Sequence, residues 1–87
     1  MNIQDVPQGI NVVVETSDLV YIGRFRQTEP GVVRLQDCAI QQCRKGQAEA
    51  FVRKTAKYGI EVQERDVMVR SGNVLRVRAL KDIPKPE

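Results

Sequence analysis

Short stretches rich in β-branched and apolar residues alternate with turn sequences along most of the chain. Such stretches, separated by glycine, proline and small polar residues, are typical of short strands joined by tight turns. The pattern predicts five strands, at residues 10–16, 19–27, 32–41, 60–70 and 73–80. We expect these strands to be mostly antiparallel.

The spacing of the apolar residues changes between the third and fourth predicted strands. In "KGQAEAFVRKTAKYG" the small and apolar residues recur at helical spacing. Lys57 lies in the last expected turn, and Gly59 follows at the position of a helix C-cap. The pattern predicts a helix from about Gln47 to Tyr58, within an insertion over about residues 45–58.

Gly23 lies inside the second predicted strand, where glycine is typical of a sharp bend or a bulge. A chain of 87 residues has room for one modest core. Bending a five-stranded sheet at such positions is expected to close it into a small barrel. We therefore predict a mainly-β fold: a small, strongly bent antiparallel barrel with the helix between strands 3 and 4. It forms a single domain over residues 1–82, followed by a polar tail at 83–87.

The order of these motifs resembles the Sm and Sm-like family. The segment "VVVETSDLVYIGRFRQTEPGVVRLQDC" is similar to the family's first motif, with Gly23 at the invariant glycine and Asp37 at the strand end. The segment "VRSGNVLRV" resembles the second motif, in which an arginine and a turn precede an apolar strand. The likeness covers about residues 10–38 and 65–80, and it implies an Sm-like, SH3-like barrel.

The resemblance also implies a partner and a site. Copies of the chain would form a ring in which strand 4 of one subunit pairs with strand 5 of the next, satisfying backbone groups that one copy leaves unpaired. Arg70 would lie at the lip of a central pore and help to hold an RNA base, with Ser71, Gly72 and Asn73 beside it. The alternative for this turn is an ordinary polar hairpin with an exposed arginine.

Two positions depart from the RNA pocket of the family. The family has a stacking residue followed by asparagine after the acidic turn, whereas this chain has Gly31 and Val32. Neither side chain stacks on a base or hydrogen-bonds its edge. An RNA-binding ring is therefore one hypothesis, and a ring-forming structural or protein-interaction module without the uridine pocket is the alternative. A monomeric SH3-like or OB-like barrel is a third possibility.

The charge balance is compatible with a nucleic-acid partner. Fourteen Lys and Arg against eleven Asp and Glu give a net charge of +3. Four basic residues of the insertion are candidates for contacts with phosphates: Lys45, Arg53, Lys54 and Lys57. The alternative is a solvated helix face.

Two pairs of arginines lie in predicted strands. Arg24 and Arg26 share one face of the second strand, as Arg76 and Arg78 do on the fifth. We expect these pairs to face solvent or to bond acidic residues of a neighbouring subunit.

Catalysis has no support in the sequence, which contains no histidine and no phosphate-binding glycine loop. Cys38 and Cys43 are too few for a structural zinc site and are interpreted as reduced packing residues. We predict a non-enzymatic protein with no cofactor and no metal. No apolar run is long enough to span a bilayer, and the start "MNIQDVPQG" is unlike a signal peptide. We therefore expect a cytoplasmic protein with no membrane partner.

Overall fold

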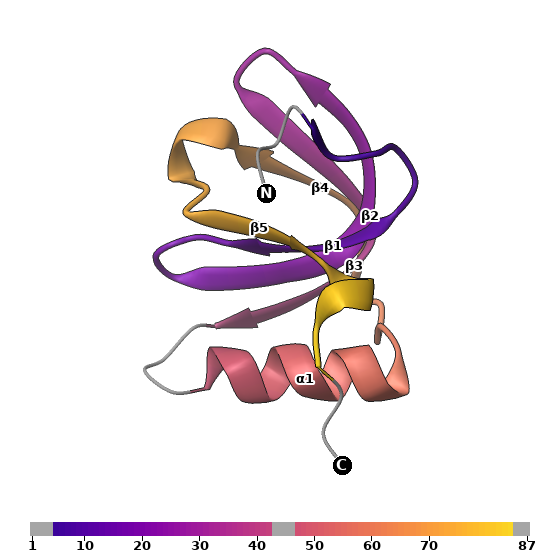
Figure 1. Ribbon diagram of the computed structural model, residues 1–87. Helices are drawn as coiled ribbons and strands as arrows, with labels where there is room; N and C mark the ends of the chain where they lie inside the picture. Colours follow the sequence, from indigo (N-terminus) through magenta and orange to yellow (C-terminus); the bar gives the residue numbers. More distant parts are fainter. Residues whose placement is uncertain (1–4, 43–46, 85–87) are drawn as a thin grey trace.

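The computed structural model describes residues 5–42 and 47–84. Within them the elements follow in this order: β1 (Asn11–Glu15), β2 (Leu19–Glu29), β3 (Val32–Gln42), α1 (Ala48–Tyr58), β4 (Glu64–Arg70), the 3-10 turn η2 (Ser71–Asn73), β5 (Arg76–Ala79) and the 3-10 turn η3 (Leu80–Asp82) (Figure 1). The predicted mainly-β fold with a helix between the third and fourth strands is confirmed.

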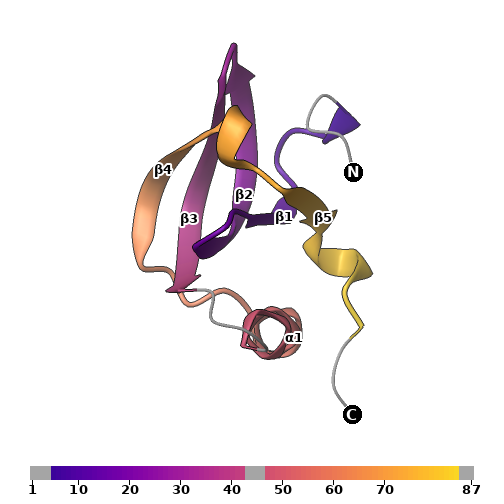
Figure 2. The ribbon, with the colours of Figure 1, turned by 90° about the vertical axis from the view of Figure 1, so that its left-hand side faces the viewer.

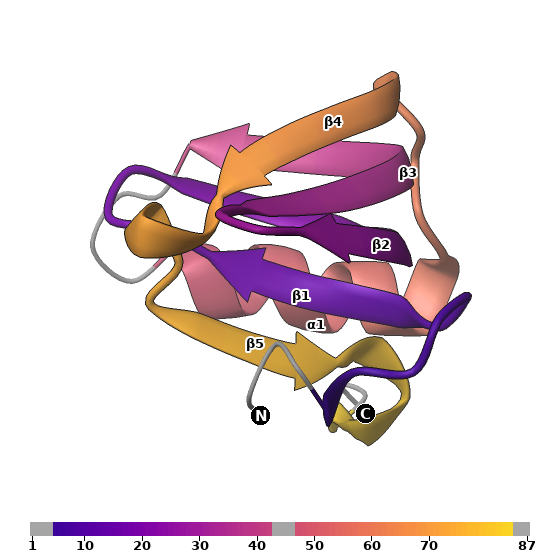
Figure 3. The same cartoon turned by 90° about the horizontal axis from the view of Figure 1, so that it is seen from above.

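The strands form one antiparallel sheet in the order β4-β3-β2-β1-β5. In the described residues β4 and β5 are the two edges and do not pair with each other (Figure 3). The prediction that the sheet closes into a barrel is therefore wrong. After β4 the chain turns through η2 and pairs its short last strand with β1, on the far side of the sheet. The sheet therefore bends without its ends meeting.

The β2–β3 ladder has two irregularities of the kind that bend a sheet. Between the pairs Ile22↔Ala39 and Arg24↔Gln36, β2 contributes only Gly23 whereas β3 contributes two residues. A second irregularity follows further along β2, between Phe25 and Gln27. An extra residue on one strand bends the ladder and increases its twist.

Gly23 allows β3 to come close at the first irregularity. A Cβ atom placed on Gly23 would lie 3.0 Å from the carbonyl oxygen of Gln36 and 3.1 Å from the Cα of Cys38. Both are backbone atoms, which cannot swing aside as the end of a flexible side chain can. The absence of a side chain at residue 23 is therefore a condition of this close approach.

Asp37 provides the extra residue of β3. Its φ of 52° places it in the left-handed region, which aspartate enters more readily than most residues do. Its carboxylate accepts a hydrogen bond from the guanidinium of Arg24 on the neighbouring strand. Both side chains are roughly half exposed, so this ion pair orients the bulge more than it stabilises the fold.

The two faces of the sheet carry separate cores. Along β1, Val12 and Val14 point into one core and Val13 points into the other, as the alternation of a strand requires. The first core is enclosed by the bend and has no helix: Val6, Val12, Val14, Phe25, Val33, Leu35, Cys38 and Val77, with Val67 of β4 packed against it. All five strands therefore contribute to it.

The second core lies between the sheet and α1 (Figure 2). Val52 of the helix packs there with Val13, Val20, Ile22 and Ile83. Ile83 begins the predicted polar tail, yet only 5% of it is exposed. The last part of that tail, residues 85–87, lies outside the described residues, as do residues 45 and 46 at the start of the predicted insertion.

Replacement of Gly23 by alanine tests the close approach at the bend. We expect Gly23→Ala to lower the free energy of unfolding by roughly 1–3 kcal/mol, because the added methyl group meets backbone atoms that must shift. Urea denaturation followed by circular dichroism measures the change. Gly72→Ala is the control, since a Cβ there meets nothing within 4 Å, and it should leave the stability nearly unchanged. Equal stability of the two variants would contradict this account.

Candidate nucleic-acid interface

Arg70 is the last residue of β4, at the turn into β5, and it is exposed to solvent. It lies opposite Val32, and the next residue, Ser71, donates its backbone N–H to the carbonyl oxygen of Gly31 at 2.9 Å. The β4–β5 turn and the β2–β3 turn are therefore joined at one end of the sheet. This places Arg70 beside Gly31 and Val32, the two positions at which a family-type RNA pocket would need a stacking side chain and an amide.

The rest of the predicted turn site follows as η2. Ser71 is half-buried, whereas Gly72 and Asn73 are exposed. The turn is closed by the backbone N–H of Val74, which donates to the carbonyl oxygen of Ser71 at 3.1 Å. Arg70 and Asn73 also line an open hollow of about 400 Å³ against the β1–β2 turn, together with Ser17, Asp18 and Tyr21. The turn therefore presents one cation and several hydrogen-bonding groups to solvent.

The basic residues of the helix form a separate surface. Arg53, Lys54 and Lys57 are all exposed on α1, and the amine of Lys57 lies 5.3 Å from the centre of the Tyr58 ring. Figures 1 and 2 show α1 at the opposite end of the molecule from the β4–β5 turn. One copy of the chain therefore does not combine Arg70 with these helix residues. The fourth predicted basic residue of the insertion, Lys45, lies outside the described residues.

The arginines of β5 are bonded within the chain. Arg78 Nη2 donates to Glu49 Oε1 at 2.7 Å and to Glu15 Oε1 at 3.2 Å. Arg76 Nη2 donates to Glu15 Oε1 at 3.0 Å and lies 3.4 Å from Glu49 Oε1. These four residues, which we call the arginine–glutamate network, join β1, β5 and the first turn of α1. The expectation of solvent exposure is therefore met by Arg76, whose side chain is 53% exposed, whereas the acidic partners of both arginines lie within the same chain.

The network shifts the pKa values of two of its members, Glu49 and Arg76. The hydrogen bond from Arg78 lowers the pKa of Glu49 below its usual value, and the positive charges of Arg78, Arg76 and Arg53 add to this effect. The hydrogen bond to Glu15 raises the pKa of Arg76. The contacts thus favour the charged forms of Glu49 and Arg76. The two arginines of β5 are therefore less available for phosphates than their exposed neighbours are.

The aromatic residues are distributed between the cores and the surface. Phe25 is buried in the first core and Phe51 is half-buried against the second, whereas Tyr58 is 72% exposed. Tyr21 is half-buried, and its burial raises the pKa of its hydroxyl above the usual value. Tyr58 on the helix is the most accessible aromatic ring for stacking.

Cys38 belongs to the first core. Burial raises the pKa of its thiol to about 11, which keeps it protonated and unreactive near neutral pH. Within residues 5–42 and 47–84 no group of three or more acidic, cysteine or histidine residues lies close enough to hold a metal ion.

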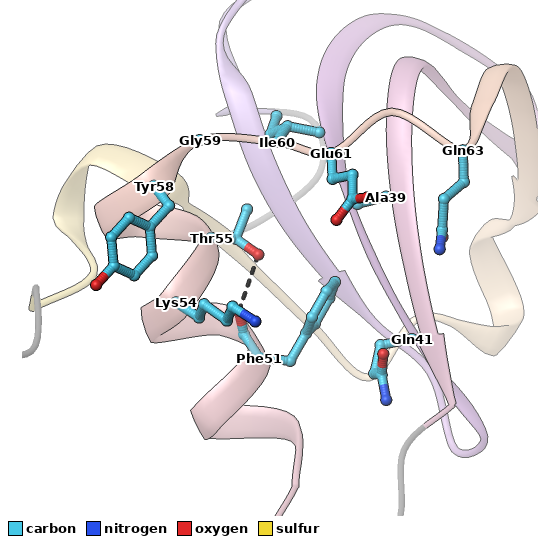
Figure 4. A pocket seen from close by; sticks show the side chains of 10 residues that line it. All are labelled: Ala39, Gln41, Phe51, Lys54, Thr55, Tyr58, Gly59, Ile60, Glu61 and Gln63. Atoms are coloured by element: carbon cyan, nitrogen blue, oxygen red, sulfur yellow. Dashed lines mark hydrogen bonds between the residues drawn. The ribbon is translucent and has the colours of Figure 1, made fainter.

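A second hollow, of about 320 Å³, lies between α1, the end of β3 and the segment that leads from the helix to β4 (Figure 4). We call it the helix hollow. Six of its lining residues carry the chemistry: Gln41, Phe51, Lys54, Ile60, Glu61 and Gln63. Of these six, only Lys54 is a predicted binding residue, because the others come from three segments whose proximity depends on the fold.

Compared with models of known protein families, the chain matches none, and a search of curated proteins finds no match either. No helix in the described part of the chain is both long and apolar enough to cross a membrane. The candidate sites therefore depend on the geometry of this chain alone.

The arginine–glutamate network predicts a lowered pKa for Glu49, which can be measured directly. We expect the pKa of Glu49 to lie below that of an ordinary glutamate, and to rise towards it in Arg78→Met, because that change removes its main hydrogen-bond donor. NMR titration of the Glu49 side-chain carboxyl carbon measures both values.

The lowered pKa of Glu49 also determines how its contribution to the stability of the fold depends on pH. A carboxyl whose pKa is lowered on folding stabilises the native state above its unfolded pKa, and this contribution is lost as the pH falls through the folded value. Because the Glu49 side chain is about half exposed, solvent screening keeps the contribution below about 1 kcal/mol. An unshifted Glu49 pKa in the unaltered protein would show that the network does not form in solution.

Proposed function

We propose that the chain is an Sm-like protein that assembles into a homo-oligomeric ring and binds RNA through the β4–β5 turn. The observation that carries the proposal is the strand order, which leaves β4 and β5 as the two edges of one bent sheet. An edge strand offers unpaired backbone groups to another strand. Pairing β4 of one copy with β5 of the next satisfies both edges, and repetition of this contact around an axis closes a ring.

The register identifies which residues of β4 face the open edge. In an antiparallel ladder, alternate residues direct their N–H and C=O groups to the same neighbour. Ser71 bonds towards β3, and the register runs without a shift from Arg70 to Asp66. The backbone groups of Asp66, Met68 and Arg70 therefore point away from β3. These are the groups that a second copy of the chain would bond.

Exposed apolar side chains accompany both edges. Met68 on β4 is 64% exposed, and Leu75, just before β5, is 72% exposed. Large apolar side chains at sheet edges favour association with another strand, since their burial is favourable. Contact between copies would remove both from water.

RNA binding is supported by the position of Arg70. In the proposed ring each copy contributes one Arg70 at the end of the pairing strand, so several guanidinium groups would surround one opening. An arginine hydrogen-bonds phosphate or base acceptors with two donors at once. The exposed residues Arg53, Lys54 and Lys57 supply a second basic surface for the RNA backbone.

The alternative function is a ring-forming structural or protein-interaction module. It is favoured by Gly31 and Val32, which lie beside Arg70 but supply neither a stacking ring nor an amide. The two functions share the ring and differ in whether RNA binds.

Substitutions at Met68 test the ring. We expect Met68→Pro to abolish assembly, because it removes an N–H group that faces the open edge while leaving the bonds to β3 in place. Light scattering of the unaltered protein should give the mass of several copies, and that of the variant the mass of one.

Met68→Ala is the matched control, because it keeps the backbone N–H group and should still assemble. Circular dichroism verifies that each variant is folded. An unaltered protein that stays a single copy at high concentration would exclude both proposed functions and support a monomeric domain.

Arg70→Ala separates the two functions. We expect U-rich or A-rich RNA to bind the unaltered protein with an affinity that falls as salt rises. Loss of Arg70 should weaken binding roughly tenfold, since a hydrogen bond to a charged group contributes about 1.5 kcal/mol. Fluorescence anisotropy at two salt concentrations measures both effects.

Lys81→Ala removes the same charge from the exposed turn η3 and serves as the control. Its affinity for RNA should remain close to that of the unaltered protein. An assembled protein that binds neither RNA at low salt would favour the interaction module instead.

A further inference from the structure

The helix hollow contains a hydrogen-bond donor that is fixed in direction. Gln63 Oε1 accepts the backbone N–H of Ile40 at 2.7 Å, and the backbone N–H of Gln63 donates to the carbonyl oxygen of Cys38 at 2.9 Å. The residue is therefore held to β3 at two points. Because its Oε1 is engaged, the Nε2 group is the free end of the amide, and in Figure 4 it lies along β3 at the edge of the hollow, on the side of Gln41.

A carboxylate lines the same hollow. Glu61, two residues earlier in the same segment, directs its side chain into the hollow beside Ala39 (Figure 4). Within residues 5–42 and 47–84 Glu61 takes part in no ion pair and no side-chain hydrogen bond. Two acceptor oxygens and one oriented donor thus line the same hollow.

The opposite wall comes from the helix. The half-buried ring of Phe51 lies in the hollow below the Gly59–Gln63 segment, and the amine of Lys54 projects beside it (Figure 4). Ile60 adds an apolar surface above. The hollow, at about 320 Å³, is within the size range of sites that hold small planar ligands.

We propose that the helix hollow binds a guanine nucleotide, presented by single-stranded RNA. Guanine places the acceptor O6 next to two adjacent donors, N1–H and the N2 amine, along its Watson–Crick edge. The two oxygens of Glu61 would accept from N1–H and the N2 amine, and the Nε2 amide group of Gln63 would donate to O6. The base packs on Phe51, and Lys54 neutralises the phosphate.

The other bases fit this arrangement less well. On the Watson–Crick edge, adenine and cytosine each offer one amino donor beside a ring-nitrogen acceptor, and uracil offers one N–H donor between two carbonyl acceptors. A carboxylate therefore gains only one hydrogen bond from any of the three. Its second oxygen would then face an acceptor. The pairing of a carboxylate with a fixed amide donor therefore selects guanine. This inference rests on the proposed RNA binding, but it uses residues at the other end of the molecule from Arg70.

A titration with free nucleotides tests the hollow without RNA. We expect guanosine 5′-monophosphate to shift the backbone amide NMR signals of Phe51, Lys54, Glu61 and Gln63 at millimolar concentration. Inosine 5′-monophosphate lacks the N2 amine and should bind several-fold more weakly, because one donor to Glu61 is lost. Absence of shifts at these residues, or equal affinity for the two nucleotides, would overturn the proposal.

Matched variants assign the selectivity to Glu61. We expect Glu61→Gln to weaken binding of guanosine 5′-monophosphate roughly tenfold, since a bidentate contact discriminates by about 1–3 kcal/mol. Glu64→Gln removes the same charge from an exposed position in β4 and should leave the affinity unchanged. Equal effects of the two substitutions would indicate a general charge effect and contradict the proposed contact.

Binding measurements with two RNA strands separate this inference from the proposed function. A seven-nucleotide adenine strand with a central guanine should bind more tightly than the same strand with inosine, and Glu61→Gln should remove the difference. Binding of the nucleotide but of no RNA supports the guanine site and excludes RNA as its source. RNA binding that depends on Arg70 but is unaffected by inosine or by Glu61→Gln supports the proposed function and overturns this inference.

Discussion

The bend of the sheet depends on the contact between Gly23 and the backbone of β3. At this point the carbonyl oxygen of Gln36 and the Cα of Cys38 would lie only 3.0 and 3.1 Å from a Cβ on residue 23, closer than such atoms normally pack. Asp37 adds the extra residue that bends β3, and Arg24 bonds its carboxylate. Because the sheet bends here, residues from all five strands reach one enclosed core, while β4 and β5 remain separate edges.

The two edges and the two hollows follow from the same architecture. The bend encloses the first core without help from the helix, so α1 is free to cover the opposite face. The arginine–glutamate network joins the first turn of the helix to β1 and β5. The other end of the helix leads into the segment that carries Glu61 and Gln63. The helix therefore contributes both to the second core, through Val52, and to the wall of the helix hollow.

The strands and the helix were predictable because their signals are local. Apolar periodicity, the glycine after Tyr58 and the turn sequences lie close together in the chain. The unpaired edges at strands 4 and 5 were expected from the resemblance and not from local signals, because pairing of β5 with β1 joins residues more than sixty positions apart. For the same reason the bonds of Arg76 and Arg78 to acidic residues of the same chain were not foreseen. Arg70 was recognisable from its motif, whereas Gln41, Glu61 and Gln63 form no motif.

The position of α1 between neighbouring antiparallel strands limits how the chain can be shortened. Since β3 and β4 lie side by side, a direct hairpin joining them would preserve every ladder of the sheet. Such a minimal version would nevertheless leave Val13, Val20 and Ile22 in contact with water, since Val52 now covers that face. The helix is therefore needed to cover this face of the sheet. A shortened chain would be prone to aggregate unless those three positions were made polar.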